Sequence, residues 1–173
     1  MKHKPLPPLE ELKEYLDYNP DTGILTWIKA KARARPELVG KEAGSDGRKT
    51  STYREITFNG ESYRIHRIAY YMYHARDPLQ FDVDHKDLDT YNNKINNLRL
   101  ATTQQNSFNR GISKTNTSGF TGVVWDKRDK RWRAKICPNG KQIHLGNFIN
   151  KEDAIQARKE GEKKYFGRFR RKD

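Results

Sequence analysis

Apolar residues near the N-terminus recur first with helical spacing and then as a short unbroken run. Leu9, Leu12 and Leu16 stand three and four residues apart among Glu and Lys, which predicts a short amphipathic helix. The next segment, YNPDTG, is rich in residues that interrupt a helix. Ile24 to Trp27 then predicts a strand, because three of its four side chains are apolar or aromatic and the fourth is β-branched.

A hairpin and a helix are predicted in the following part of the chain. Two β-prone runs, Tyr53 to Phe58 and Glu61 to Ile65, flank the dipeptide Asn59-Gly60, which is a strong signal for a tight hairpin turn. From His66 to His74 the apolar residues have helical spacing, and Asp77-Pro78 ends the pattern. We expect this apolar stripe to lie in the core.

The C-terminal third alternates apolar and polar residues in three short segments and then changes to a helical pattern. The alternating segments are Thr121 to Trp125, Arg131 to Ile136 and Gln142 to Leu145, and turn-forming residues separate them. The helical pattern runs from Lys151 to about Tyr165. We therefore expect a three-stranded antiparallel sheet packed on one helix.

Basic residues are in clear excess over acidic ones. The 173 residues include 35 Lys and Arg against 22 Asp and Glu, a formal charge of +13, and residues 118–173 hold 16 basic and 7 acidic residues. A nucleic acid is the polyanion that best matches such a surface, because its binding gains from counterion release. A solvated basic surface without a partner is the alternative that charge alone leaves open.

Composition excludes several other classes of protein. Hydrophobic residues make up 34% of the chain, which favours several small structured pieces over one large core. No apolar run approaches the ~20 residues of a membrane span, and the N-terminus lacks the apolar segment of a signal peptide. We therefore expect no membrane partner and a cytoplasmic location. The single Cys137 excludes an internal disulfide framework and a zinc site built from cysteines.

One segment, residues 81–109, gathers an acid, an imidazole and several amides. Asp84 and His85 are adjacent, and asparagines follow at positions 92, 93, 96, 97, 106 and 109. An isolated Asp-His pair is weak evidence for a site, and clustered asparagines also form turns and caps. Hydrolysis of a phosphodiester, however, needs a base that activates water and a hard cation that stabilises charge, and this set supplies suitable groups for both.

Three motifs in this region resemble the HNH endonucleases of phage and mobile-intron type, over roughly residues 50–110. They are HRIAYYMYH, VDHKDLDTYNNKINNLRLAT and QQN. The resemblance implies a ββα-metal active site in which His85 is the general base and Asp84 a metal ligand. It also implies that Asn97 braces the finger and orients the base through hydrogen bonds. Asn106 takes the position of the family's last His or Asn and is the second implied metal ligand.

The chain departs from the full His-Asn-His form because that last residue is Asn106. An oxygen pair from Asp84 and Asn106 suits Mg²⁺ or Mn²⁺ better than Zn²⁺, which prefers His or Cys. The resemblance implies a homing-type endonuclease whose products carry 5′-phosphate and 3′-hydroxyl ends.

The C-terminal unit from Ser118 to Gly167 resembles the DNA-binding domain of plant ethylene-response factors of APETALA type. The matching elements are SGFTGV, WRAKI, HLGNF and the closing YFG. In that family one face of the sheet contacts the major groove. The resemblance implies that this face, which reads bases, carries Arg131, Arg133, Lys135, Gln142 and His144, and that phosphates are held by the turn residues Lys127 and Arg128. The family has Arg at two groove-facing positions where this chain has Val124 and Asp126, so the plant target sequence is not implied.

Together these patterns predict an α+β protein in which a small HNH ββα-metal module precedes a DNA-binding sheet. Four parts are expected. Residues 1–52 form an N-terminal helix, strand and basic loop, and residues 53–110 the nuclease module. Residues 111–117 are a linker, and residues 118–169 are the DNA-binding domain. We expect a monomer that acts on double-stranded DNA in the cytoplasm of a bacterial host. The alternative is a catalytically inactive DNA-binding regulator. An RNA-binding module ranks last, because the sheet lacks a paired aromatic stacking platform.

Overall fold

The structure, a computed structural model, describes residues 3–30, 36–46 and 52–171. The chain forms two compact units, residues 1–103 and 104–173, which are treated separately below. Parts of the basic loop predicted in the N-terminal region, residues 31–35 and 47–51, lie outside the described residues. Within the described ranges no helix is long and apolar enough to cross a membrane.

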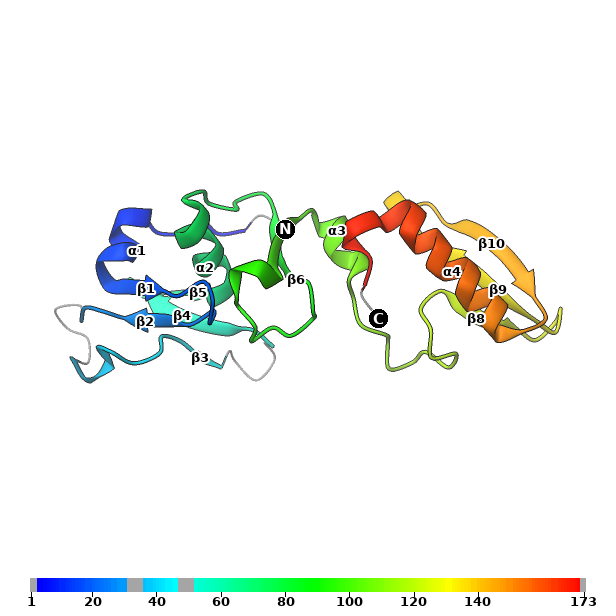
Figure 1. Cartoon of the computed structure of the whole chain (residues 1–173), viewed down its shortest axis with the longest axis horizontal. Coiled ribbons are helices and arrows are strands. Elements are labelled where there is room, and N and C mark those ends of the chain that lie inside the picture. The colour runs from blue at the N-terminus through cyan, green and yellow to red at the C-terminus, as the bar shows by residue number, and fades with distance from the viewer. Residues whose placement is uncertain (1–2, 31–35, 47–51, 172–173) are drawn as a thin grey trace. The chain divides into compact units, whose positions relative to one another are not determined.

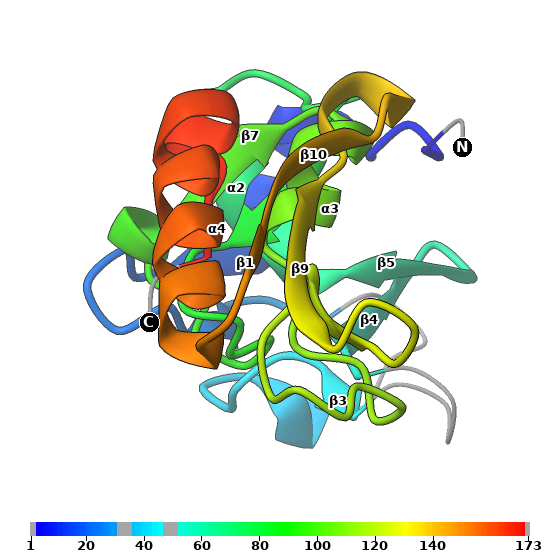
Figure 2. The same ribbon diagram turned by 90° about the vertical axis from the view of Figure 1, so that its right-hand side faces the viewer.

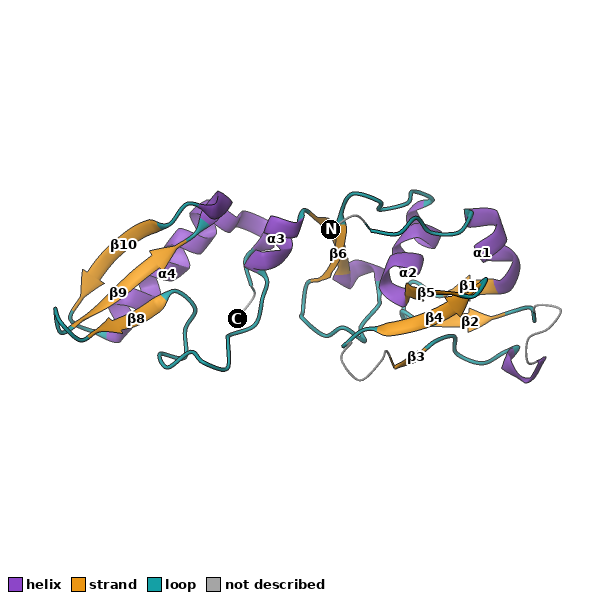
Figure 3. Cartoon of the chain, turned by 180° about the vertical axis from the view of Figure 1, so that it is seen from behind, coloured by secondary structure: helices purple, strands orange, loops and turns teal. Residues whose placement is uncertain are grey.

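The first unit combines two α-helices with several small antiparallel sheets, whose strands are short (Figure 3). The sheets have the strand orders β1-β2, β3-β4-β5 and β6-β7. The elements, labelled in Figure 1 where there is room, are α1 (Leu9–Tyr15), β1 (Leu16–Tyr18), β2 (Leu25–Trp27), the 3-10 turn η1 (Pro36–Leu38), β3 (Ser45–Asp46), β4 (Arg54–Phe58), β5 (Glu61–Arg64), α2 (Ile65–His74), β6 (Asp82–His85), η2 (Ile95–Asn97) and β7 (Leu98–Ala101).

The predicted hairpin and the helix after it are confirmed. Strands β4 and β5 pair around Asn59 and Gly60, whose φ angles of 53° and 78° give the left-handed turn that Asn-Gly favours. Helix α2 follows at once and ends at Ala75, which has a left-handed φ of 52°. The first predicted helix is one residue shorter than expected, because Leu16 instead begins β1 and pairs with Trp27.

Helix α2 separates two apolar clusters in the first unit. Ile65 and Ile68 belong to the larger cluster, with residues from α1, β1, β2 and β4. Ala69 belongs to a smaller cluster with Val83 of β6 and Leu98 of β7. The same helix thus packs against the β6-β7 pair, which carries Asp84 and His85.

The second unit contains the predicted three-stranded antiparallel sheet backed by one helix, with strand order β10-β9-β8. Helix α4 runs along one side of β9 and β10 (Figure 2). Small residues allow this close packing, since a side chain at Gly161 would lie 2.9 Å from Leu145. The elements are α3 (Thr103–Phe108), which begins at the unit boundary, β8 (Val123–Asp126), β9 (Arg131–Ile136), η3 (Pro138–Gly140), β10 (Ile143–Phe148), α4 (Lys151–Phe166) and η4 (Gly167–Phe169).

The boundary between the units falls earlier than the linker expected at residues 111–117. Phe108 stacks on Phe166 with ring centroids 3.9 Å apart. Asn116 donates to the carbonyl of Phe120 and accepts from the backbone N–H of Gly119. These contacts attach the segment that precedes the sheet to the second unit.

Two glycines with similar backbones test the packing of this unit. Gly122 and Gly119 have φ angles of 77° and 74°, but only at Gly122 would a Cβ clash, 2.4 Å from the carbonyl oxygen of Lys135. Gly122→Ala should lower the free energy of unfolding by about 3 kcal/mol, and Gly119→Ala by about 1 kcal/mol, because the second carries only the cost of positive φ. Chemical denaturation followed by circular dichroism measures both, and equal losses would contradict this packing.

Candidate active site

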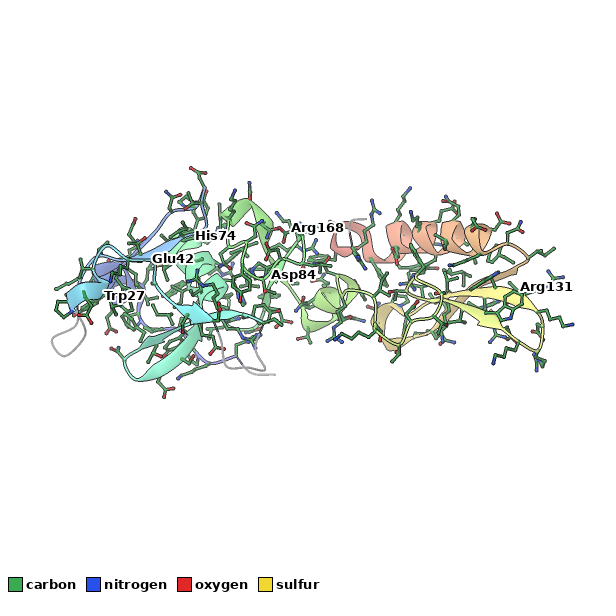
Figure 4. All side chains as sticks on the ribbon, turned by 90° about the horizontal axis from the view of Figure 1, so that it is seen from below. Trp27, Glu42, His74, Asp84, Arg131 and Arg168 are labelled. Atoms are coloured by element: carbon green, nitrogen blue, oxygen red, sulfur yellow. The ribbon has the colours of Figure 1, made fainter. Side chains whose placement is uncertain are left out.

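Asp84 lies on the short β6-β7 ladder, opposite an arginine. It pairs in register with Arg99 of β7, and the Nε and Nη2 atoms of Arg99 lie 2.8 and 2.7 Å from Oδ2 of Asp84. The acid is 6% exposed. The hydrogen bond from Nε and the ion pair with Nη2 fix the orientation of the carboxyl group. Figure 4 labels Asp84 among the side chains of this unit.

His85 is buried among other rings and has a defined hydrogen-bond partner. It is 4% exposed, and its ring lies 5.0 Å from that of His66 and 6.0 Å from that of Tyr53. Its Nε2 lies 3.0 Å from Oδ1 of Asn93. An amide oxygen only accepts hydrogen bonds, so with this amide orientation Nε2 carries the proton and Nδ1 carries the lone pair.

The surroundings keep both imidazoles neutral near pH 7. Burial lowers the pKa of His85, although the hydrogen bond with Asn93 acts in the opposite direction. Burial, together with the neighbouring His85, lowers the pKa of His66 well below its ordinary value. A neutral His85 is able to accept a proton, which is the first requirement for a general base.

Asn97 holds the loop that follows His85. Its Oδ1 accepts from the backbone N–H of Asp87 at 3.2 Å, and its Nδ2 donates to Oδ1 of Asp87 at 2.9 Å and to the carbonyl of Asn92 at 2.8 Å. Burial raises the pKa of Asp87, but the hydrogen bonds from Asn92 and Asn97 outweigh it and lower the pKa below its usual value. The loop is therefore closed around an ionised carboxylate.

The hydrogen bond to the candidate base differs from the one expected. The family resemblance implied that Asn97 both braces the finger and orients His85, but the amide bonded to the imidazole belongs to Asn93. Asn93 is itself buried, and its Nδ2 lies 3.4 Å from the carbonyl of Tyr91. The sequence holds four asparagines at positions 92, 93, 96 and 97, and nothing in their spacing distinguishes which one reaches the ring.

The second expected metal ligand, Asn106, lies on α3 in the second unit, so its pairing with Asp84 stays a prediction. In the described part of the chain no three His, Cys, Asp or Glu side chains gather in a way that could hold a metal ion. Mg²⁺ commonly takes only one or two protein carboxylates and completes its shell with water and substrate phosphate. A donor set of one carboxylate and one amide therefore fits such an ion.

In the second unit the predicted basic residues divide between the sheet, a turn and a loop. Arg131, Arg133 and Lys135 alternate on β9 with Trp132 and Ala134, which belong to the apolar cluster against α4. His144 pairs with Lys135 and lies on the same face. Arg131 is at the turn end of β9 (Figure 4). Lys127 and Arg128 lie in the β8-β9 turn, whereas Gln142 precedes β10 and lines a hollow with Cys137.

A β-bulge changes which residue of β10 faces this side of the sheet. The register shifts between His144 and Gly146, so that Asn147 lies opposite Arg133. Simple alternation from His144 would place Gly146 on that face instead. Simple alternation therefore misses Asn147. The sequence signal for the bulge is Gly146, which has a φ of 141° in the structure.

Comparison with known proteins identifies one domain of the chain. Residues 63–108 match the sequence model of the HNH endonuclease family. The chain is 40% identical over 65 residues to Protein 3.8 of Escherichia phage T7, covering 38% of this chain and 54% of that protein. It is 30% identical over 115 residues to the Uncharacterized HNH endonuclease L560 of Acanthamoeba polyphaga mimivirus, covering 66% and 59%.

The chain thus spans somewhat more than half the length of these viral relatives, and no solved structure matches it. The matched range contains α2, both strands of the β6-β7 ladder, and the loop that Asn97 holds. Residues 63–108 of this chain are accordingly an HNH endonuclease family domain.

Proposed function

We propose that this chain is a metal-dependent HNH endonuclease of homing type that hydrolyses double-stranded DNA. The observation that carries the proposal is the buried His85, whose Nε2 is hydrogen-bonded to Asn93 and which directly follows Asp84 in β6. The family match over residues 63–108 supports the same chemistry. The viral sources of the relatives support a protein that acts in the cytoplasm of an infected host.

In the proposed mechanism His85 acts as the general base. With the proton on Nε2 held by Asn93, Nδ1 accepts the proton of a water molecule. The resulting hydroxide attacks phosphorus in line with the leaving 3′ oxygen, which gives 5′-phosphate and 3′-hydroxyl ends. Asn97 has a structural part in this scheme, since it holds the loop between His85 and β7.

Asp84 and Asn106 are the residues proposed to hold Mg²⁺ or Mn²⁺. When bound, the ion supplies stabilisation of the negative charge that develops on the scissile phosphate and the leaving oxygen. Arg99 contributes by keeping the carboxylate of Asp84 in one orientation. Because Arg99 contacts Oδ2 of Asp84, a cation has to compete with the guanidinium for this oxygen.

We propose that the chain acts as a monomer and that its second unit binds the DNA. Support comes from its excess of basic residues and from the placement of Arg131, Arg133, Lys135 and His144 on the sheet face away from α4. The similarity to ethylene-response-factor domains stays part of the proposal. Lys127, Arg128 and Gln142 lie outside the strands and suit phosphate contacts better than base contacts.

A second candidate function is a DNA-binding regulator that does not cleave. The deep burial of His85 and the arginine bound to Asp84 favour it, because both reduce access of water and metal to these groups. The two candidates differ in one measurable property, which is metal-dependent cleavage.

Purified protein incubated with supercoiled plasmid and Mg²⁺ should nick or linearise it, and a chelator should stop the reaction. His85→Ala should abolish cleavage, a loss of at least about 100-fold, because a general base contributes about 10²- to 10⁴-fold to the rate. Binding of His85→Ala to DNA, measured by gel shift, should be unchanged. Wild-type cleavage by this variant would refute the role of His85, and a wild-type protein without any cleavage would favour the regulator.

Asn93→Ala should reduce cleavage about 10- to 100-fold and lower the free energy of unfolding by about 1 to 3 kcal/mol, because a buried hydrogen bond is lost. The variant leaves Nε2 of His85 without its acceptor, so the ring no longer holds one tautomer and orientation. Single-turnover cleavage of plasmid measures the effect. Asn96→Ala is the control, because Asn96 is an exposed neighbour of the same type. Equal rates in the two variants would contradict a role for Asn93 in positioning the base.

Asn97→Ala should lower the free energy of unfolding by about 2 to 3 kcal/mol. The substitution removes three hydrogen bonds made by a buried amide, two with Asp87 and one with the carbonyl of Asn92. Cleavage should fall together with stability. Asn96→Ala again serves as the matched control, and thermal and chemical denaturation provide the measurement. A variant of normal stability would show that the loop does not depend on this amide.

A further inference from the structure

We propose that Val124, Arg133 and Asn147 form a row that reads base edges of double-stranded DNA, and that Asp126 determines its specificity by holding Arg133. This inference rests on the proposed function of the second unit as a DNA-binding unit. It adds Asn147, which simple strand alternation would not place on this face, and it assigns roles to Val124 and Asp126.

The three residues lie in one line across the sheet. In the register of the ladders, Val124 of β8 and Asn147 of β10 are both directly opposite Arg133 of β9. Directly opposed residues of antiparallel strands share a face, and Arg133 alternates with residues packed on α4. Adjacent strands are about 4.8 Å apart, so the row is about 10 Å wide, which is close to the width of the major groove.

Each member of the row offers a different kind of base contact. Arginine donates two hydrogen bonds to guanine, asparagine pairs with the edge of adenine, and an apolar side chain contacts the methyl group of thymine. Val124 is 40% exposed, and Asn147 is exposed. Valine has no hydrogen-bond donor for a phosphate, so its exposed position beside the central arginine favours contact with bases.

Asp126 connects Arg133 to the adjacent turn. Its Oδ1 accepts from the backbone N–H groups of Arg128 and Asp129, at 3.0 and 3.2 Å. Its Oδ2 forms an ion pair with Nη2 of Arg133. The side chains of Asp126 and Arg133 are 17% and 38% exposed, so the guanidinium is restrained yet open to a ligand.

This arrangement has opposite effects on affinity and on specificity. A carboxylate on a DNA-binding face repels phosphates, so it weakens binding to every sequence. A guanidinium that is already oriented loses less freedom when it binds, and it meets its base with fixed geometry. Asp126 should therefore reduce binding to unrelated DNA while improving discrimination in favour of the matched site.

The test uses Asp126→Asn in the full chain, combined with His85→Ala so that the DNA stays intact. Asparagine keeps an oxygen for the two turn hydrogen bonds but replaces the charged oxygen that holds Arg133. A matched duplex is first obtained by selecting from a random duplex library with the His85→Ala protein. Dissociation constants are then measured for this duplex and for a scrambled one at the same salt concentration.

Asp126→Asn should bind the scrambled duplex several-fold more tightly, and its ratio of matched to scrambled affinity should fall about tenfold. Glu160→Gln is the control, because it removes one negative charge from α4, where the carboxylate contacts Gln156. It should change both affinities equally and leave the ratio unchanged. An unchanged ratio in Asp126→Asn, or an equal fall in the control, would overturn the proposal.

A second pair of variants keeps the row testable if Asp126→Asn disturbs the turn. Arg133→Ala and Asn147→Ala should each relax the selected sequence at one position, and the two positions should be neighbours. Selection that recovers no preferred sequence with the His85→Ala protein would overturn base reading by this face. Failure of the nuclease proposal is seen separately, as absence of plasmid cleavage by the wild-type chain.

Discussion

Amide hydrogen bonds, rather than apolar packing, hold the segment that carries His85. The apolar cluster beside it is small, with Ala69, Val83 and Leu98 buried and three partly buried side chains packed against them. The loop after β6 buries no large apolar side chain among its described residues. Asn97 bonds this loop at three points, and its own carbonyl accepts from the N–H of Lys86. Because an unsatisfied buried polar group costs about 1–3 kcal/mol, such a network stabilises the loop only when it is complete.

Both units pair a carboxylate with an arginine on a neighbouring strand, but with different burial. The side chains of Asp84 and Arg99 are 7% and 13% exposed, so separating them would leave a buried charge at high cost. Asp126 and Arg133 are more exposed, and their interaction is weakened by solvent. The first pair is therefore suited to fixing a group in place, and the second to releasing an arginine toward a ligand.

Local patterning predicted the elements better than it predicted their irregularities. The Asn59-Gly60 hairpin, α2 and the sheet backed by α4 each follow from signals within a few residues. The face of Asn147 does not, because one extra residue at the bulge reverses the alternation and only pairing with β9 reveals it. The hydrogen-bond partner of His85 could not be predicted from the sequence either, because neighbouring asparagines have the same chemistry and differ only in where the fold places them.

The hydrolysis proposed for His85 does not depend on the DNA sequence, because every phosphodiester presents the same kind of phosphorus atom to the attacking water. Selection of a site then depends on contacts with base edges, and a uniformly basic face would bind all duplexes through their phosphates. Asp126 lies among basic residues in a unit with a large positive excess, where it opposes that general attraction. A protein that needed only to adhere to DNA would gain affinity by losing this carboxylate, whereas a nuclease that must ignore most sequences gains by keeping it.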